Sequence, residues 1–440
     1  MHEQALPVPD SASLAGHRYP VVVIGGGQAG LAISYLLKER GLEHLVLEKN
    51  RVAESWRTRR WDTFCLVTPN WQCQLPGFPY AGPDPEGFMV KDQIVEYLEA
   101  YVRSFDPPVH EGVTVTRLRR APLSGFELTT SAGIVTAEQV VIATGGYQEA
   151  TMPRLAERLP GTLAQIHSSD YKNPESLPPG EVLVVGSGQS GCQIAEDLHL
   201  AGRKVHLCVG GAPRTARRYR GRDVVAWLDD MGYYNKPIEE HPQKERVRAK
   251  ANHYVTGRDG GRDIDLRRFA LEGMKLYGRL KDVRGTVLHF SPDLRQNLDQ
   301  ADNVAESIKT TIDKYVEAHG VEAPLEPRYS PVWQPEREVL EMDYFVAGIR
   351  GIVWSIGFHS DYRWIELPIF DGTGYPGHDR GVTPVPGLYF LGLPWQHTWG
   401  SGRFSGVAQD ARYLAERIAL LRQASTRSAD FPLNEWALGS

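Results

Sequence analysis

The sequence has little of what marks a membrane, secreted or nucleic-acid-binding protein. None of its apolar runs approaches the roughly 18 residues that a membrane-spanning helix needs. Its four cysteines are scattered without CxxC spacing, which argues against a disulfide framework and a zinc site. A net charge of -5 argues against nucleic acid as a partner. Residues 1–17 are polar and lack the basic start and apolar block of a signal peptide, so we expect a flexible leader and a cytoplasmic location.

What the sequence does have is length and two Gly-rich turns. A chain of 440 residues is too long for one hydrophobic core. The first turn, GGGQAG, follows residues 19–24, a β-branched run typical of a strand buried on both faces. Gly25 permits the tight bend, Gly27 lets the backbone approach a pyrophosphate, and Gly30 allows close packing of the helix on the strand. Glu48 ends the next predicted strand, where its carboxylate can accept the ribose hydroxyls, so this turn is predicted to bind FAD.

The second turn, GSGQSG at residues 186–191, also joins an apolar strand to a helix. The next predicted strand, residues 205–209, ends without an acid and is followed by an arginine-rich stretch. A carboxylate there would repel a 2′-phosphate, whereas guanidinium groups fork onto phosphate. Both features favour NADPH over NADH, with the phosphate contact expected from Arg214 first and from Arg217 or Arg218 second. A solvated basic loop is the alternative interpretation.

Two further apolar runs, VVIATGGY at residues 140–147 and GIVWSIGF at residues 351–358, end in small-residue turns where the backbone can approach a cofactor. They suit chain crossings between an FAD domain and an inserted NADPH domain. The sequence therefore predicts an α/β fold with two Rossmann-like dinucleotide-binding domains and a helical insertion in the second. The expected bounds are an FAD-binding domain at 18–166 and 345–425, an NADPH-binding domain at 167–344 with a mostly helical insertion at 223–343, and a tail at 426–440.

Two helical patterns stand out in the insertion. Asp265 can cap a helix whose apolar stripe runs to Tyr277, and Asp302 can cap another that Gly320 ends. Residues 254–265 (YVTGRDGGRDID) have the composition of an exposed, charged loop. The insertion is expected either to cap the active site, which we favour, or to form a subunit interface such as that of a homodimer.

An aromatic loop follows the last predicted strand, residues 388–391. In two-dinucleotide flavoproteins the helix after such a loop points its N-terminus at the pyrimidine end of the flavin, where its partial positive charge favours the reduced anion. Trp395, His397 and Trp399 are then catalytic candidates beside the ring. Their alternation is equally compatible with strand-like packing.

With these motifs in place, the sequence resembles the flavin-containing monooxygenases, particularly the YUCCA-like branch and the bacterial CzcO-type flavoproteins. The resemblance covers most of residues 18–222 and 345–422. Trp56 and Arg57 stand where that family has a turn beside the flavin, and residues 66–79 (LVTPNWQCQLPGFP) are similar to its segment lining the flavin ring. The resemblance and the motifs imply cofactor contacts from Gly25, Gly27, Gln28, Ala29, Gly30, Glu48, Lys49, Trp56, Arg57, Val115, Ala143, Thr144, Gly145, Gly186, Gly188, Gln189, Ser190, Gly191, Arg214, Arg217 and Arg218.

The resemblance implies an NADPH-dependent flavin monooxygenase in which O2 and reduced FAD form a flavin C4a-(hydro)peroxide. This adduct would oxygenate a small-molecule nucleophile (nitrogen, sulfur or an electron-rich ring carbon), or a carbonyl or 2-oxo acid. Asn70 is the candidate hydrogen-bond donor to the adduct, with a structural turn residue as the alternative. His167 lies in the family's stretch between the nucleotide motifs, where it either helps to place NADP or makes structural hydrogen bonds.

Three rival functions remain to be weighed. A dithiol–disulfide reductase is disfavoured because Cys65 and Cys73 lie on an irregular segment without redox-pair spacing. An NADPH-dependent flavin oxidase or reductase without oxygen insertion, and a non-enzymatic flavoprotein regulator, stay open as alternatives.

Overall fold

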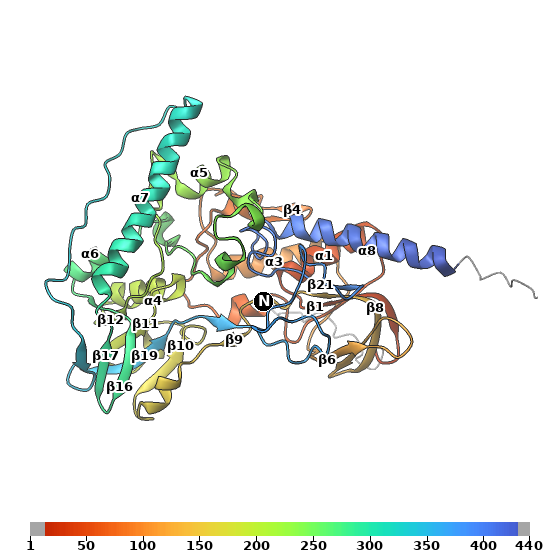
Figure 1. The fold of residues 1–440 in the computed structure, drawn as a ribbon, viewed down its shortest axis with the longest axis horizontal. Helices are drawn as coiled ribbons and strands as arrows, with labels where there is room; N and C mark the ends of the chain where they lie inside the picture. Colours follow the sequence, from red (N-terminus) through yellow and green to blue (C-terminus); the bar gives the residue numbers. More distant parts are fainter. Residues whose placement is uncertain (1–13, 430–440) are drawn as a thin grey trace, which may run out of the picture.

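The computed structural model describes residues 14–429, which form two lobes, each built on a largely parallel sheet (Figure 1). The predicted α/β class with two Rossmann-like units is confirmed. Most of the predicted leader lies outside the described residues. Its end does not hang free, because Leu14 is buried and the Gly16 amide donates to the Ile134 carbonyl oxygen at 3.0 Å. No helix among residues 14–429 is long and apolar enough to cross a membrane.

The first sheet carries the N-terminal Gly-rich turn at the end of its strand β1 (Arg18–Ile24). Alternate side chains of β1 enter different cores, which explains the unbroken apolar run. Val21 and Val23 pack under the helices, whereas Val22 and Ile24 face the opposite layer. In spatial order the strands are β5 (Val109–His110), β2 (Leu45–Leu47), β1 (Arg18–Ile24), β8 (Gly133–Ile142), β7 (Phe126–Thr130) and β6 (Val115–Arg120). β21 (Leu388–Phe390) also pairs with β8. The helices of this lobe are α1 (Gln28–Glu39), α3 (Lys91–Phe105) and α8 (Val407–Ala429).

The second sheet is parallel throughout and carries the second Gly-rich turn after β11 (Glu181–Val185). Its strands, in spatial order, are β10 (Ala164–His167), β19 (Ile349–Trp354), β11 (Glu181–Val185), β12 (Val205–Cys208) and β15 (Lys275–Tyr277). One face packs on α4 (Gln189–Leu200), α6 (Leu266–Leu271) and the start of α7 (Leu294–His319), and the other on the antiparallel strands β16 (Leu280–Arg284), β17 (Val287–Phe290) and β18 (Glu341–Asp343).

The second lobe extends further along the chain than the predicted bounds allow. β19 follows residue 345, which was assigned to the first domain, yet it pairs with β10 and β11 of the second sheet. The true crossings are β9 (Glu149–Ala150) and β20 (Phe358–His359), which pair antiparallel between the lobes (Figure 1). Both lie at or just after the two small-residue turns that the sequence identified as crossings.

The helical pattern after Asp265 is confirmed only over its first half. The Asp265 carboxylate accepts from the Arg267 amide at 2.9 Å and caps α6, as predicted. The helix ends at Leu271 because Gly273 has a φ of +110°, and Tyr277 lies on strand β15 instead. The insertion is therefore mixed rather than mostly helical.

The long helix α7 was placed correctly at its end and wrongly at its start. Gly320, with a φ of 61°, terminates it as predicted, but the helix begins after Asp293. Asp302 lies inside the helix, where its carboxylate bonds Arg214 and Arg267. An acid that serves a distant arginine cannot be told from a capping acid by local pattern alone.

Candidate cofactor and active site

The two Gly-rich turns have the same geometry. A Cβ on Gly30 would lie 1.8 Å from the Gly25 oxygen, and a Cβ on Gly191 would lie 1.8 Å from the Gly186 oxygen. The first glycine of each turn has a φ above +100° and also lacks room for a side chain. Both turns thus require glycine for the close helix–strand packing that the motif predicts.

The middle glycine of each turn borders open space instead. Nothing lies within 4 Å of where a Cβ of Gly27 or Gly188 would stand. These residues are the N-caps of α1 and α4, and neither helix has a side-chain cap or an acid in its first turn. The free amides and the helix dipole at these ends fit the phosphates of two dinucleotides.

The glutamine at the same position of each turn hydrogen-bonds a segment that is distant in sequence. Gln28 donates to the Gly402 oxygen at 3.3 Å, and Gln189 donates to the Val255 oxygen at 2.6 Å. Each turn is therefore tied to a loop that arrives from far along the chain.

Glu48 lies where the first turn needs an acid. Its Oε2 accepts from the Gly26 amide at 2.7 Å and its Oε1 from the Asn50 amide at 2.9 Å. The neighbouring Lys49 is exposed, and the Glu48 carbonyl accepts from the Val113 amide, two residues before the predicted contact Val115. The carboxylate is oriented by backbone amides beside the turn, which fits a ribose-binding acid.

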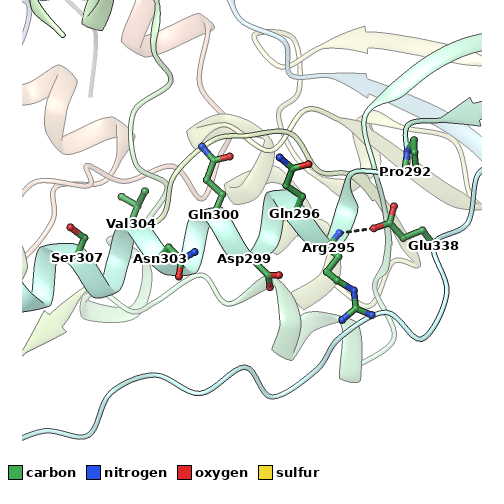
Figure 2. Close-up of a pocket in the computed structure, with 9 residues that line it drawn as sticks. All are labelled: Pro292, Arg295, Gln296, Asp299, Gln300, Asn303, Val304, Ser307 and Glu338. Carbon is green, nitrogen blue, oxygen red and sulfur yellow. Dashed lines mark hydrogen bonds between the residues drawn. The ribbon is translucent and has the colours of Figure 1, made fainter. Parts of the chain in front are cut away.

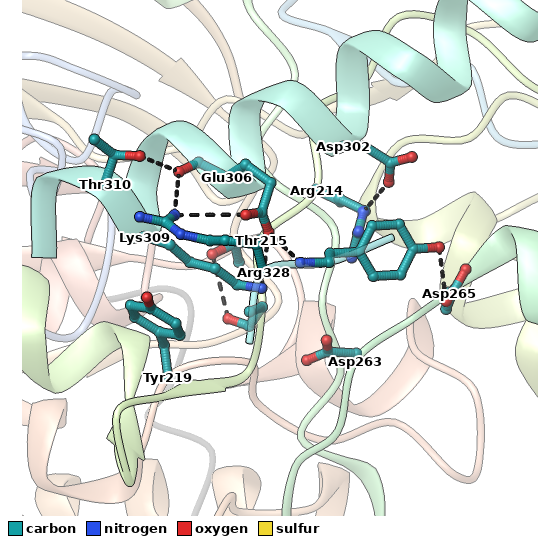
Figure 3. A network of polar contacts seen from close by, with 12 residues as sticks. Arg214, Thr215, Tyr219, Asp263, Asp265, Asp302, Glu306, Lys309, Thr310 and Arg328 are labelled. Atoms are coloured by element: carbon teal, nitrogen blue, oxygen red, sulfur yellow. Dashed lines mark hydrogen bonds and ion pairs between the residues drawn. The ribbon is translucent and has the colours of Figure 1, made fainter. Parts of the chain in front are cut away.

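The arginines after β12 have structural partners, which corrects the prediction that they are free for phosphate. The Arg214 guanidinium is buried and pairs with Asp302 at 2.6 Å (Figure 3). It also stacks on the Tyr329 ring. Arg217 is 2% exposed and pairs with Asp223 at 2.6 Å. Arg218 is exposed on a two-residue strand. The first two serve to fasten the insertion, because separating a buried pair is costly.

A different arginine lies beside the end of β12. The position of a Cβ on Gly210 would be 3.9 Å from the side chain of Arg279, which follows β15. The Arg279 side chain is 68% exposed, and its Nε is held at 2.6 Å by Asp293. Sequence reasoning missed it because β15 was read as helix, so Arg279 had no assigned place at this sheet edge.

The carboxyl ends of the two sheets face each other across the lobe junction. Ala143, Thr144 and Gly145 follow β8, and the Tyr147 ring after them contacts Phe358, which follows β19, at 5.6 Å. The His167 ring lies 4.8 Å from the same Phe358. Its Nε2 bonds the Gly357 oxygen at 3.0 Å and its Nδ1 bonds Ser169 at 2.9 Å, so both ring nitrogens have structural partners.

An aromatic wall joins the turn at Trp56 to the C-terminal loop. The Trp56 ring stacks on Phe404 with centroids 5.7 Å apart and also contacts Phe64. Arg57, next to it, pairs with Glu99 of α3. Trp56 and Arg57, both predicted beside the flavin, therefore differ in role. Trp56 belongs to the aromatic wall, and Arg57 anchors α3.

The predicted donor Asn70 already uses its amide within its own loop. Its Nδ2 donates to the Asp84 oxygen at 2.9 Å and its Oδ1 accepts from the Met89 amide at 2.7 Å. This corrects its role to a buried structural residue. Two residues later, Gln72 is 2% exposed and neither end of its amide has a partner among the described residues. A buried amide without partners is costly unless a ligand satisfies it, and the sequence gives no signal for it.

The predicted catalytic residues of the C-terminal loop lie under the insertion. Trp395 is buried against His241, with ring centroids 5.1 Å apart. The His397 carbonyl accepts from the Ile238 amide at 2.7 Å, and Trp399 packs on Tyr234 at 4.5 Å. The insertion therefore covers this loop, as expected of a cap, and Trp395 packs on the cap.

The remaining candidates are two cysteines and a groove along α7. Cys65 and Cys73 are both free and buried, and burial raises their pKa to about 11 and about 12, so neither is suited to be a redox thiolate. A groove of about 690 Å³ lies along α7 from Arg295 to Ser307, with Glu338 at its Arg295 end, and is lined mostly by polar side chains (Figure 2). None of its lining residues belongs to either Gly-rich turn.

Comparison with known proteins agrees with this geometry. A family model described as pyridine nucleotide-disulphide oxidoreductase matches residues 22–261. An uncharacterized CzcO-like oxidoreductase of Geobacillus kaustophilus is 34% identical over 406 residues, which are 91% of this chain and 99% of the relative. The rice indole-3-pyruvate monooxygenase YUCCA4 is 34% identical over 196 residues, covering 40% of this chain and 44% of that protein. A mutant flavin monooxygenase from Stenotrophomonas maltophilia has a similar fold, with a TM-score of 0.61 at 18% identity over 92% of this chain and 98% of its own.

Proposed function

The chain belongs to the pyridine nucleotide-disulphide oxidoreductase family, among its flavin monooxygenase-like members, and on this premise we propose that it uses FAD, NADPH and O2 to oxygenate a small molecule. FAD binds at the first Gly-rich turn and NADPH at the second. The single observation that supports this most is the pair of matched turns, each of which leads into an uncapped helix end with open space beside its middle glycine. The sequence-level resemblance to the flavin-containing monooxygenases is confirmed.

The residues present fit FAD in the first lobe. The N-terminal amides of α1 would hold its pyrophosphate and Glu48 its ribose. Gln72 and Ser405 offer buried polar atoms without partners in the described structure, in the two segments that meet at Phe404. When bound, the flavin supplies hydride acceptance from the nicotinamide and the reaction with O2.

The chain's own contribution is to enclose the junction. The cap segment around Ile238 closes over the loop that bears Trp399. Trp56, Phe64 and Phe404 give the junction an apolar wall that limits water. Excluding water from such a site prevents side reactions with water and strengthens the electrostatic interactions within the site. The acceptor is proposed to be an electron-rich small molecule or a carbonyl compound.

The test is the fate of molecular oxygen. Purified holoenzyme with NADPH and a panel of amines, thioethers, indoles and 2-oxo acids should consume NADPH faster with one class. In 18O2 the product of that class should carry the label. Stoichiometric hydrogen peroxide without labelled product from any class would instead support an oxidase, and no NADPH consumption at all would support a regulatory flavoprotein.

Coenzyme choice gives a second expected result. Arg279→Ala should raise the KM for NADPH by about tenfold while changing that for NADH little, because one charge-assisted phosphate contact contributes roughly 1.5 kcal/mol or more. Steady-state kinetics with both coenzymes measure it. Arg284→Ala is the matched control, since that side chain is 73% exposed and pairs only locally with Asp282. Equal effects on both coenzymes would refute the phosphate contact.

A further inference from the structure

We propose that a groove on the first lobe binds an organic ammonium ion, and this inference does not depend on the function proposed above. The groove has a volume of about 570 Å³. It lies between α3 and the hairpin of β3 (Gln74–Leu75) and β4 (Phe78–Pro79), with the loop that follows this hairpin. None of its lining residues belongs to either Gly-rich turn or to the C-terminal loop at residues 392–406. Its volume is typical of small-molecule pockets, which are roughly 300–1,000 Å³.

One face of α3 forms a side of the groove. Glu96, Tyr97 and Ala100 line it together with Gln93, and their spacing of three and four residues places them on the same helix face. Ala100 contributes only a methyl group, which leaves room for a ligand beside the helix. Glu96 is exposed, and in residues 14–429 no hydrogen bond or ion pair involves its carboxylate. The groove therefore contains one carboxylate that is free to pair with a cation.

Three aromatic rings also line the groove. They belong to Phe78, Tyr80 and Tyr97, and the Phe78 and Tyr97 centroids are 5.5 Å apart. The Tyr97 hydroxyl donates to the Phe78 carbonyl oxygen at 2.6 Å, which fixes that ring to the hairpin. A Cβ on Gly82 would clash with the Tyr80 hydroxyl, so glycine leaves the space that the Tyr80 ring occupies. The faces of such rings are negative and attract a cation that lies over them.

The chain around the groove is acidic. Residues 77–100 contain five carboxylates and one lysine. Lys91 already pairs with Asp62 at 3.1 Å, and Arg57 with Glu99. In the part of the chain that the structure describes, no ion pair involves the four other carboxylates of this stretch, which are Asp84, Glu86, Asp92 and Glu96. No lysine, arginine or histidine lines the groove, so its field is complementary to a positive charge.

These features together select an ammonium ion with an apolar body. The rings and the side chains of Met89 and Ala100 provide apolar contact, and Glu96 provides the opposite charge. A bare metal ion requires several oxygen ligands, and no group of three or more suitable side chains occurs among residues 14–429. The groove also borders the aromatic wall, because the Tyr97 ring meets Phe404 edge-on with centroids 5.8 Å apart.

Calorimetric titration of the oxidised holoenzyme, without NADPH, tests the proposal. The probes are choline and (3-hydroxyphenyl)trimethylammonium, beside their neutral isosteres 3,3-dimethyl-1-butanol and 3-tert-butylphenol. A quaternary nitrogen has no lone pair, so neither cation can accept oxygen at that atom in the reaction site. At least one cation should bind about tenfold or more tightly than its isostere, because both the rings and the carboxylate favour the charge.

Three variants locate the binding. Glu96→Gln should remove most of the preference for the cation and leave the affinity of the isostere unchanged. Ala100→Leu should weaken both ligands, because the larger side chain fills the groove without changing its charge. Asp92→Asn is the matched control, since it removes a carboxylate from the same helix that does not line the groove, and it should change the affinity less than twofold.

Equal binding of each cation and its isostere would overturn the proposal. An equal loss in Asp92→Asn and Glu96→Gln would assign the binding to the general acidic field and overturn the groove as a site. Unchanged affinity in Ala100→Leu, or displacement of the cation by NADP, would place the ligand elsewhere and also overturn it.

Discussion

Replacing Gly30 with alanine is expected to leave the protein largely without FAD. The added Cβ would stand 1.8 Å from the Gly25 oxygen, so α1 must move away from β1. Overpacking of this kind costs roughly 1–3 kcal/mol, and the shift also displaces the free amides that hold the pyrophosphate. We expect FAD affinity to fall by about tenfold or more, since 1.4 kcal/mol corresponds to a factor of ten. The flavin-to-protein absorbance ratio and a fluorescence titration of apoprotein with FAD measure it.

Gly191→Ala is the matched variant for the second lobe. Its clash with the Gly186 oxygen is equal in distance, so it should retain FAD and slow flavin reduction by NADPH instead. Gly161→Ala is the neutral control, because nothing lies within 4 Å of its Cβ position. Loss of FAD from Gly191→Ala, or full FAD occupancy in Gly30→Ala, would contradict the assignment of one dinucleotide to each turn.

The sequence predicts well what is encoded locally. Strand, glycine turn and helix are contiguous in both nucleotide units, so Gly25, Gly30, Gly186 and Gly191 lie where the motif requires. Glu48 is found at the end of β2 for the same reason. In each case the packing constraint and the chemistry act within one short stretch of chain.

The predictions that were wrong depend on contacts between residues that are distant in sequence. β19 joins the second sheet through pairing with β10 and β11, and no local pattern reports which sheet a buried parallel strand enters. An arginine-rich stretch looks the same whether it faces phosphate or carboxylates. Only the structure reveals that Asp302, which the sequence predicts as a helix cap, lies inside α7 and pairs with Arg214.

Arg217→Ala is expected to destabilise the holoenzyme by about 3–5 kcal/mol, the usual cost of removing one partner from a buried ion pair. The Arg217 side chain bonds Asp223 at 2.6 Å and the Val67 oxygen at 2.7 Å, and lies over Phe88 at 4.8 Å. It therefore joins the start of the insertion to the first lobe. Without it, the Asp223 carboxylate stays buried with only the Val225 amide as a partner. Urea unfolding followed by flavin fluorescence measures the change.

Arg117→Ala provides the comparison, because its pair with Glu366 is about half exposed and solvent screening leaves such a pair little effect on stability. The same Arg217→Ala protein also decides between two roles for this residue. If Arg217 links the two lobes, the Arg217→Ala protein should lose flavin at a lower urea concentration, with the ratio of KM for NADPH to KM for NADH unchanged. If stability were preserved and only the KM for NADPH rose, Arg217 would be a phosphate ligand and the buried pair would be incidental. The 2% exposure of the Arg217 side chain favours the role of a link between the lobes, because a phosphate would have to displace Asp223 to reach the guanidinium.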